Sequence, residues 1–135
     1  MNAEMKKKLA KNWFKILQDM ICRGIEELEG GKKFIVTEWK RNKKNEGGGE
    51  YRVLKEGKIF EKVGVNFSEV YGKFSKEFRN KIPGTNLNPS FWASGISIVM
   101  HTKNPHVPAM HFNTRYIYTS HGWFGGGMDI TPSIK

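Results

Sequence analysis

The sequence is short of cysteine, of acidic residues and of long apolar runs, and each shortage excludes a class of protein. Cys22 is the single cysteine, which excludes a disulfide-stapled scaffold and any zinc finger built on paired thiols. No apolar stretch reaches the ~18 residues that a membrane-spanning helix needs. The lysine-rich residues 6–11 lead into an amphipathic segment, not the apolar core of a secretory signal. We therefore expect a cytoplasmic protein without a membrane span.

Acidic residues number 13 against 23 lysines and arginines, which gives the 135-residue chain a formal net charge of +10. Such an excess favours an anionic partner: a nucleic acid, a membrane surface or an acidic small molecule. The charge is uneven, because only Lys103, Arg115 and Asp129 are charged between residues 82 and 134. A charge kept in such a segment is costly unless it is paired or used on a ligand. Arg115 and Asp129 are therefore candidate site residues.

Enough apolar material remains for one core, because 38% of the residues are hydrophobic and 13% are aromatic. Apolar residues recur every three or four positions before Gly30, which predicts an amphipathic helix over residues 5–29. The residues of this stripe are Leu9, Trp13, Ile16, Leu17, Met20, Ile21, Ile25 and Leu28. Cys22 lies close to the stripe, and we interpret it as a small buried hydrophobe and not as a catalytic thiol.

Strands are expected from about residue 34 to residue 128. In the first part of this region they are residues 34–39, 51–54, 58–62 and 63–70. The Glu56–Gly57 pair predicts a hairpin turn, and Gly64 is a candidate bulge. We expect loops over residues 41–50 and 72–90, the second with one helical turn near residues 76–79.

Two longer alternating segments follow, residues 93–102 and 109–119, joined by a proline-containing connection over residues 103–108. Two successive antiparallel strands would bring polar side chains from both segments to one shared face. These side chains are Ser97 and His101 from the first strand, and His111, Asn113 and Arg115 from the second.

Each of these residues has a functional and a structural interpretation. Arg115 can bind a carboxylate or phosphate through two parallel hydrogen bonds, or it can pair with Asp129, the only acid within 35 residues on either side. His111 can donate or accept a proton, since an unperturbed imidazole titrates near pH ~6.5, or it can be a satisfied structural residue. The histidines at 101, 106 and 111 have no Asp, Glu or Cys nearby in sequence, which disfavours a metal site completed within this chain.

Three stretches together resemble the oxygen-dependent coproporphyrinogen III oxidases of haem biosynthesis: residues 60–68, 104–115 and 123–132, which read FEKVGVNFS, NPHVPAMHFNTR and WFGGGMDITP. Residues 17–22 and 39–49 are similar to the N-terminal portion of that family. The resemblance implies an α+β fold, with a broad antiparallel β-sheet flanked by helices, and a homodimer. It also implies that molecular oxygen is used to convert two propionates of coproporphyrinogen III to vinyl groups, which releases carbon dioxide and gives protoporphyrinogen IX.

The resemblance also implies roles for individual residues. His111 matches the family's proton donor, Asp129 matches a residue that handles the pyrrole nitrogens, and we group both with Arg115 as the catalytic set. Residues that match the substrate-lining positions are Ser97, Asn113, Thr114 and Arg115. We expect Asp129 to be buried, so that it accepts hydrogen bonds from several pyrrole N–H groups at once. Family members are described as needing no cofactor or, in bacteria, as using a divalent metal such as manganese, and His101 and His111 match two of its ligand positions.

The chain ends just after residues 129–132, which resemble the start of a helix, whereas family members continue well beyond. We therefore expect residues 1–135 to be the N-terminal part of a single domain, with an unpaired strand at the edge of its sheet. On this view the chain alone is inactive or barely folded, and its partners are coproporphyrinogen III and a second copy, with no nucleic acid. The alternative is a non-catalytic basic module that binds RNA or a tetrapyrrole.

Overall fold

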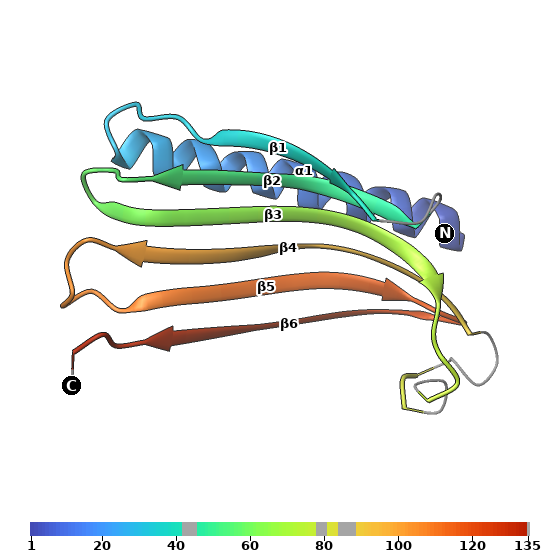
Figure 1. Cartoon of the computed structure of the whole chain (residues 1–135). Coiled ribbons are helices and arrows are strands. Elements are labelled where there is room, and N and C mark those ends of the chain that lie inside the picture. Colours follow the sequence, from blue (N-terminus) through green and yellow to red (C-terminus); the bar gives the residue numbers. More distant parts are fainter. Residues whose placement is uncertain (42–45, 78–80, 84–88, 135) are drawn as a thin grey trace.

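The computed structural model describes residues 1–41, 46–77, 81–83 and 89–134 (Figure 1). These residues form one long helix and one six-stranded antiparallel sheet, in which every strand pairs with its neighbour in sequence. The elements are α1 (Ala3–Leu28), β1 (Ile35–Lys40), β2 (Gly47–Lys55), β3 (Phe60–Lys73), β4 (Ser90–Thr102), β5 (Ala109–Tyr118) and β6 (Gly122–Thr131). The broad antiparallel sheet is confirmed, but the described residues supply a single helix where helices on its flanks were expected.

Helix α1 begins and ends where local sequence signals place it. The Asn2 side chain accepts a hydrogen bond from the backbone N–H of Met5 at 2.8 Å, which caps the first turn. The chain leaves the helix through Gly30 and Gly31, whose φ angles of 75° and 105° lie in the left-handed region that glycine adopts without strain. The predicted helix is therefore correct to within two residues at each end.

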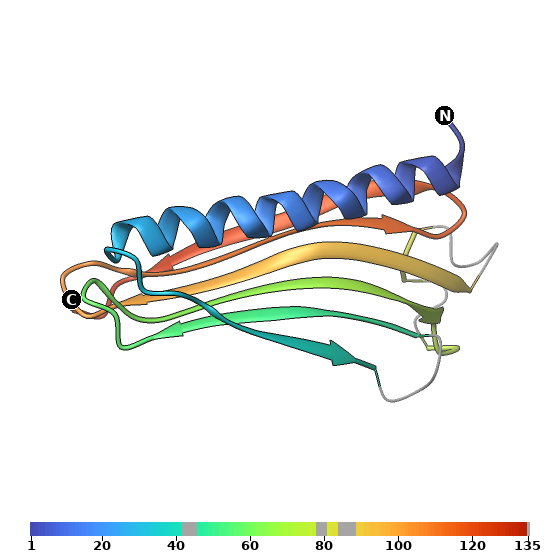
Figure 2. The ribbon, with the colours of Figure 1, turned by 90° about the horizontal axis from the view of Figure 1, so that it is seen from above.

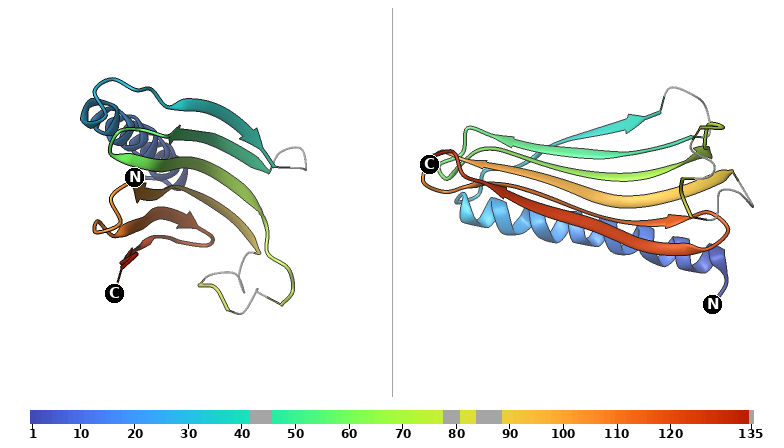
Figure 3. Two further views of the ribbon diagram at one scale, coloured as in Figure 1. Left: turned by 60° about the vertical axis from the view of Figure 1, so that its left-hand side comes forward. Right: turned by 90° about the horizontal axis from the view of Figure 1, so that it is seen from below.

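One face of the sheet is covered and the other is open. Figure 2 shows α1 lying lengthwise along one face of the curved sheet, and Figure 3 shows the opposite face without a covering element. The helix contacts β3, β4 and β5, and the hydrophobic core lies between them. The core residues with the least exposure are Phe14, Cys22, Leu54, Val63, Val65 and Ile98. The open face remains available for a site.

The row of helix residues that faces the sheet differs from the stripe expected from sequence. Leu9, Trp13, Ile16, Met20 and Leu28 are about half exposed or more, whereas Ile25 is buried and Leu17 and Ile21 are partly buried. The sheet-facing row is Ala10, Phe14, Gln18, Cys22 and Ile25. Gln18 is polar yet fully buried because its amide donates to the carbonyl oxygens of Glu50 and Val65, at 2.9 and 3.1 Å. A hydrophobicity pattern does not identify a core position whose polar group is satisfied in this way.

Cys22 is part of this row and is buried, as the sequence indicated. Burial raises the pKa of its thiol from 9.0 to about 11, and the nearby Arg52 offsets only part of this effect. A thiol with so high a pKa is almost wholly protonated near neutral pH, so the packing interpretation is confirmed.

Three predictions of secondary structure were wrong. Residues 47–50 belong to β2 and not to a loop, because Gly48 and Gly49 pair with β1 on one side and β3 on the other. Residues 60–73 form one continuous strand, with its irregularity between Phe60 and Lys62 and not at Gly64. Residues 129–131 complete β6 and do not begin a helix. The predicted helical turn at residues 76–79 lies partly outside the described residues.

The end of α1 is tied to the turn between β2 and β3 by Glu29. Its buried carboxylate accepts hydrogen bonds from the backbone N–H groups of Lys58, Ile59 and Phe60, the last two at 3.0 and 2.7 Å. Desolvation raises the pKa of this carboxyl, but the three backbone donors and Lys32 outweigh it, so that the pKa lies below its ordinary value.

Candidate functional site

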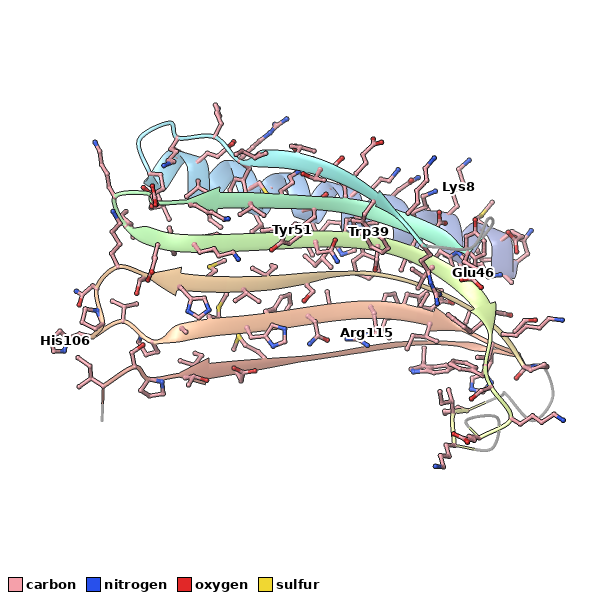
Figure 4. All side chains as sticks on the ribbon, in the orientation of Figure 1. Lys8, Trp39, Glu46, Tyr51, His106 and Arg115 are labelled. Carbon is pink, nitrogen blue, oxygen red and sulfur yellow. The ribbon has the colours of Figure 1, made fainter. Side chains whose placement is uncertain are left out.

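The open face of the sheet brings together most of the polar residues selected from sequence. Across β4 and β5, Ser97 lies directly opposite Asn113, and Val99 lies opposite His111. Across β5 and β6, Asp129 lies opposite His111, and Gly125 lies opposite Arg115. Directly opposed residues in a sheet point to the same side. The predicted shared face is therefore confirmed, and Figure 4 views it with Arg115 labelled.

His111 and Asp129 form the closest ionisable pair on this face. The imidazole Nδ1 lies 3.4 Å from Oδ2 of Asp129, and the Thr131 hydroxyl lies 3.4 Å from Oδ1 of the same carboxylate. The side chain of Asp129 is 63% exposed, so the expectation of a buried carboxylate was wrong for the described structure. Asp129 is exposed because β6 is the last strand of the sheet and, among the described residues, no element covers the open face.

Arg115 does not pair with Asp129. Its guanidinium Nη2 donates to Oδ1 of Asn113 at 2.9 Å, and the side chain is exposed. The register explains this difference, because Arg115 lies opposite Gly125, four residues from the carboxylate that was its candidate partner. Arg115 therefore keeps hydrogen-bonding capacity for a ligand, since a guanidinium carries five N–H donors.

Thr114 lies apart from the other expected substrate residues. It is opposite Ile96, which is buried in the core, so its side chain is on the helix side of the sheet. Strand alternation separates it from Asn113 and Arg115, and only its backbone can contribute to the open face.

A shallow depression of about 230 Å³ lies at the centre of the open face. Its lining includes polar residues of three strands that lie on this face: Asn66, Ser68, Ser97, Asn113 and Arg115. Asn66 and Ser68 of β3 were not selected from sequence. The alternation of polar Asn66 and Ser68 with buried Val65 and Phe67 is the signal that could have identified them.

Glycines leave parts of the open face without side chains. At Gly125 and Gly127 of β6 an added Cβ would have no neighbour within 4 Å, so the space above them is free. Gly64 of β3 lies beneath the ring of Tyr51, whose hydroxyl would be 2.7 Å from an added Cβ. The face thus offers a broad surface of low relief, which suits a flat ligand.

The histidines do not complete a metal site within the described part of the chain. His101 and His111 share the open face on neighbouring strands. No group of three or more His, Cys, Asp or Glu residues there is arranged to hold a metal ion. The residues present therefore do not by themselves fit a bound metal, which takes at least three protein ligands in most such sites.

Many basic residues of the first half are paired with acids. Lys11 lies 3.0 Å from Glu69, and Arg23 and Arg52 lie 3.0 and 3.2 Å from the two carboxylate oxygens of Asp19. Such pairing leaves fewer basic side chains free to contact a phosphate backbone than the total of 23 lysines and arginines suggests. Among the described residues, no helix is long and apolar enough to cross a membrane.

Together the fold and the polar face define an α+β protein with its candidate site on the open face of an antiparallel sheet. The family model described as Coproporphyrinogen III oxidase matches residues 9–135. Oxygen-dependent coproporphyrinogen-III oxidase of Rickettsia felis (strain ATCC VR-1525 / URRWXCal2) is 53% identical over 135 residues, which covers 93% of this chain and 47% of the relative. That of Rickettsia africae (strain ESF-5) is 51% identical over 141 residues, which covers 98% of this chain and 49% of the relative.

The chain therefore belongs to the coproporphyrinogen III oxidase family. It spans about half the length of the curated relatives it matches.

Proposed function

We propose that the protein acts in the oxygen-dependent oxidative decarboxylation of coproporphyrinogen III to protoporphyrinogen IX, in haem biosynthesis. The observation that supports this most strongly is the strand register, which gathers Ser97, His111, Asn113, Arg115 and Asp129 on one open face of a chain of this family. The substrate is a broad macrocycle with four carboxylates, so it calls for a wide open surface and a cationic anchor.

The chemistry is the same at each of the two reacting propionates. The bond to the carboxyl carbon breaks and releases CO2, one C–H bond breaks on the carbon next to the pyrrole ring, and a vinyl double bond forms. Each propionate loses two electrons and one proton, so the two decarboxylations together supply four electrons and two protons. With two further protons from solvent, these reduce one O2 to two molecules of water.

In this proposal each polar side chain has a distinct task. Arg115 binds a propionate carboxylate, and Ser97 and Asn113 hydrogen-bond the substrate beside it. His111 donates a proton to the oxygen as it is reduced, and Asp129 holds the imidazole in position from 3.4 Å. The exposed Asp129 carboxylate can also accept hydrogen bonds from pyrrole N–H groups of a macrocycle lying on this face.

Molecular oxygen is the co-substrate, and the proposed reaction requires no other cofactor. Should a divalent metal such as manganese bind, His101 and His111 would supply two imidazole ligands, and the others would come from outside the described residues. The proposal also places the reaction in the cytoplasm and the family-length enzyme in a homodimer, without a nucleic-acid partner.

A chimera provides the test, because the chain spans half of its relatives. Residues 1–135 would replace the matching half of the Rickettsia felis relative, and protoporphyrin fluorescence would measure turnover of coproporphyrinogen III. We expect His111→Ala to lower kcat at least about 100-fold, the range of a lost general acid. His106→Ala, which alters an exposed histidine in the β4–β5 connection, is the matched control and should leave kcat within about 2-fold. Full activity of the His111 variant would contradict the assigned role, and an inactive parent chimera would contradict the proposed function.

A further inference from the structure

Three polar residues form a straight row across the centre of the open face. Asn66 of β3 lies opposite Ser97 of β4, which in turn lies opposite Asn113 of β5. All three line the same depression, together with Arg115. Asn66 is the member of this row that neither the family resemblance nor the sequence pattern selected.

The orientation of the Asn66 amide is set by Trp39, whose position is visible in Figure 4. The indole Nε1–H of Trp39 donates to Oδ1 of Asn66 at 2.8 Å, although β1 and β3 are separated by β2. Gly49 of β2 lies beneath the indole, and a Cβ there would be 2.8 Å from its nearest ring carbon. The missing side chain of Gly49 thus gives the indole a path across β2 to Asn66.

This hydrogen bond fixes which half of the amide faces the ligand. An indole nitrogen can only donate, so the atom of Asn66 that meets it is the acceptor oxygen, and the Nδ2 donors are directed elsewhere. Asn113 has the same polarity, because Arg115 donates to its Oδ1 at 2.9 Å. The Oδ1 atoms of Asn66 and Asn113 therefore both accept hydrogen bonds from protein donors. The row as a whole presents N–H and O–H groups to a ligand. An array of donors beside a guanidinium is suited to a carboxylate.

We propose that Asn66 binds a carboxylate of the tetrapyrrole substrate through Nδ2, and that Trp39 is the positioning residue that holds its amide in the donor orientation. This inference rests on the function proposed above and extends the site from β4–β6 to β3. The row then carries donors on three adjacent strands, which spreads the contacts across the breadth of a macrocycle.

The test uses coproporphyrin III, the stable oxidised form with the same four carboxylates, and its neutral tetramethyl ester. Binding to the 135-residue chain would be followed by the shift of the porphyrin absorption band. We expect Asn66→Asp to weaken binding of the acid about 10-fold or more, because an acceptor replaces a donor to a charged group. Binding of the ester should stay within about 2-fold. Trp39→Phe should lower the acid-to-ester preference about 3-fold, since the amide loses its fixed orientation.

Asn2→Asp is the matched control, because it adds the same charge at the start of α1, where aspartate caps a helix as well as asparagine does. It should leave both affinities unchanged. In the chimera described above, Asn66→Asp should raise KM about 10-fold with kcat within about 2-fold. A parent protein that binds coproporphyrin while the Asn66 variant keeps its acid-to-ester preference would overturn this inference alone. A parent protein that neither binds nor turns over the tetrapyrrole would overturn the proposed function together with it.

Discussion

Glu29 shows how much of the fold can depend on one acidic residue. Its carboxylate closes the junction between the end of α1 and the β2–β3 turn by accepting three backbone N–H groups. The pKa of Glu29 is lowered in the folded protein, so the charged form is the one that the fold prefers. Stability contributed by a carboxyl of lowered pKa is present above its unfolded pKa of ~4.3 and is lost as the pH falls through the folded pKa.

We predict that Glu29→Gln lowers the free energy of unfolding at pH 7 by about 2 kcal/mol, because charge-assisted hydrogen bonds to buried donors are lost. The gap between parent and variant should start to shrink as the pH falls below the unfolded pKa of ~4.3, and should close as the pH falls through the lowered folded pKa, where the parent carboxyl is protonated too. Urea denaturation of both proteins from pH 7 to pH 3 would measure it. A gap that stays constant over this range would contradict the role given to the charge.

Sequence reasoning selected the residues of the open face but not their partners. Alternation along each strand was sufficient to place His111 and Arg115 on one side, because neighbours two apart share a face. Which acid meets which base depends on the register between β5 and β6, and register is a property of two strands. Asp129 consequently lies beside His111, and Arg115 donates a hydrogen bond to Asn113 instead.

At the scale of the element, α1 carries apolar residues on more than one side, and only the structure shows which side is buried. We predict that Phe14→Ala, which empties a fully buried position, lowers the free energy of unfolding by about 3–5 kcal/mol. Ile16→Ala is its control two residues away, where the side chain is 54% exposed, and should cost less than about 1 kcal/mol. Thermal or urea unfolding of both variants measures the difference, and equal losses would contradict the observed orientation of the helix.

The glycines of the strands fall into two kinds. At Gly95 of β4 an added Cβ would lie 2.3 Å from the backbone oxygen of Thr114, whereas at Gly127 of β6 it would meet nothing within 4 Å. We predict that Gly95→Ala destabilises the protein by about 1–3 kcal/mol, as overpacking does, and that Gly127→Ala leaves stability within about 0.5 kcal/mol. Gly127→Ala should nevertheless weaken coproporphyrin III binding, because its methyl group rises into the surface on which the ligand is proposed to lie. Melting curves and a porphyrin titration test both parts, and unchanged binding would show that the ligand does not lie over β6.

The sequence pattern predicted that most of the strands exist, but it did not predict where all of them begin and end. The alternating residues of β4 and β5 identified both strands with small errors at their ends. Residues 47–49 were assigned to a loop because three glycines carry no side-chain pattern, yet their backbone groups pair on both sides within the sheet. Glycine weakens a strand on average, but two neighbouring strands can hold it in the sheet.

At the scale of the whole molecule, the helix-covered side of the sheet is only partly covered. A mostly apolar groove remains between α1 and strands β5 and β6, lined by Leu9, Trp13, Tyr116, Trp123 and Phe124 among others. On the same side of β6, Met128 and Ile130 are more than half exposed. Large apolar side chains exposed together in this way form a surface that can associate with another apolar surface.

We predict that the purified 135-residue chain binds the dye ANS at this surface and associates with itself as its concentration rises. The double variant Leu9→Lys with Phe124→Lys should reduce dye fluorescence severalfold, because it places two charges in the groove. Glu38→Gln with Glu61→Gln, on exposed positions of β1 and β3, raises the net charge by the same two units and is the matched control. Dye titration and sedimentation at several concentrations are the measurements, and equal dye binding by the groove variant and its parent would contradict this prediction.

The α+β class and the broad sheet were predictable because family resemblance and strand pattern agree. The number of helices on the sheet was not, since the described residues place one helix on one face and leave the other open. Residues 1–135 do form a continuous core between α1 and the sheet.

The simple strand order also has a kinetic consequence. Because each strand pairs with the next one along the chain, most connections close over a few residues and cost little entropy. The exception is the connection between β3 and β4, which spans residues 74–89. We therefore expect β1–β2–β3 and β4–β5–β6 to form early as separate three-stranded units, and their docking to limit the folding rate. Helix α1 contacts β3, β4 and β5, so it packs across the boundary between the two three-stranded units.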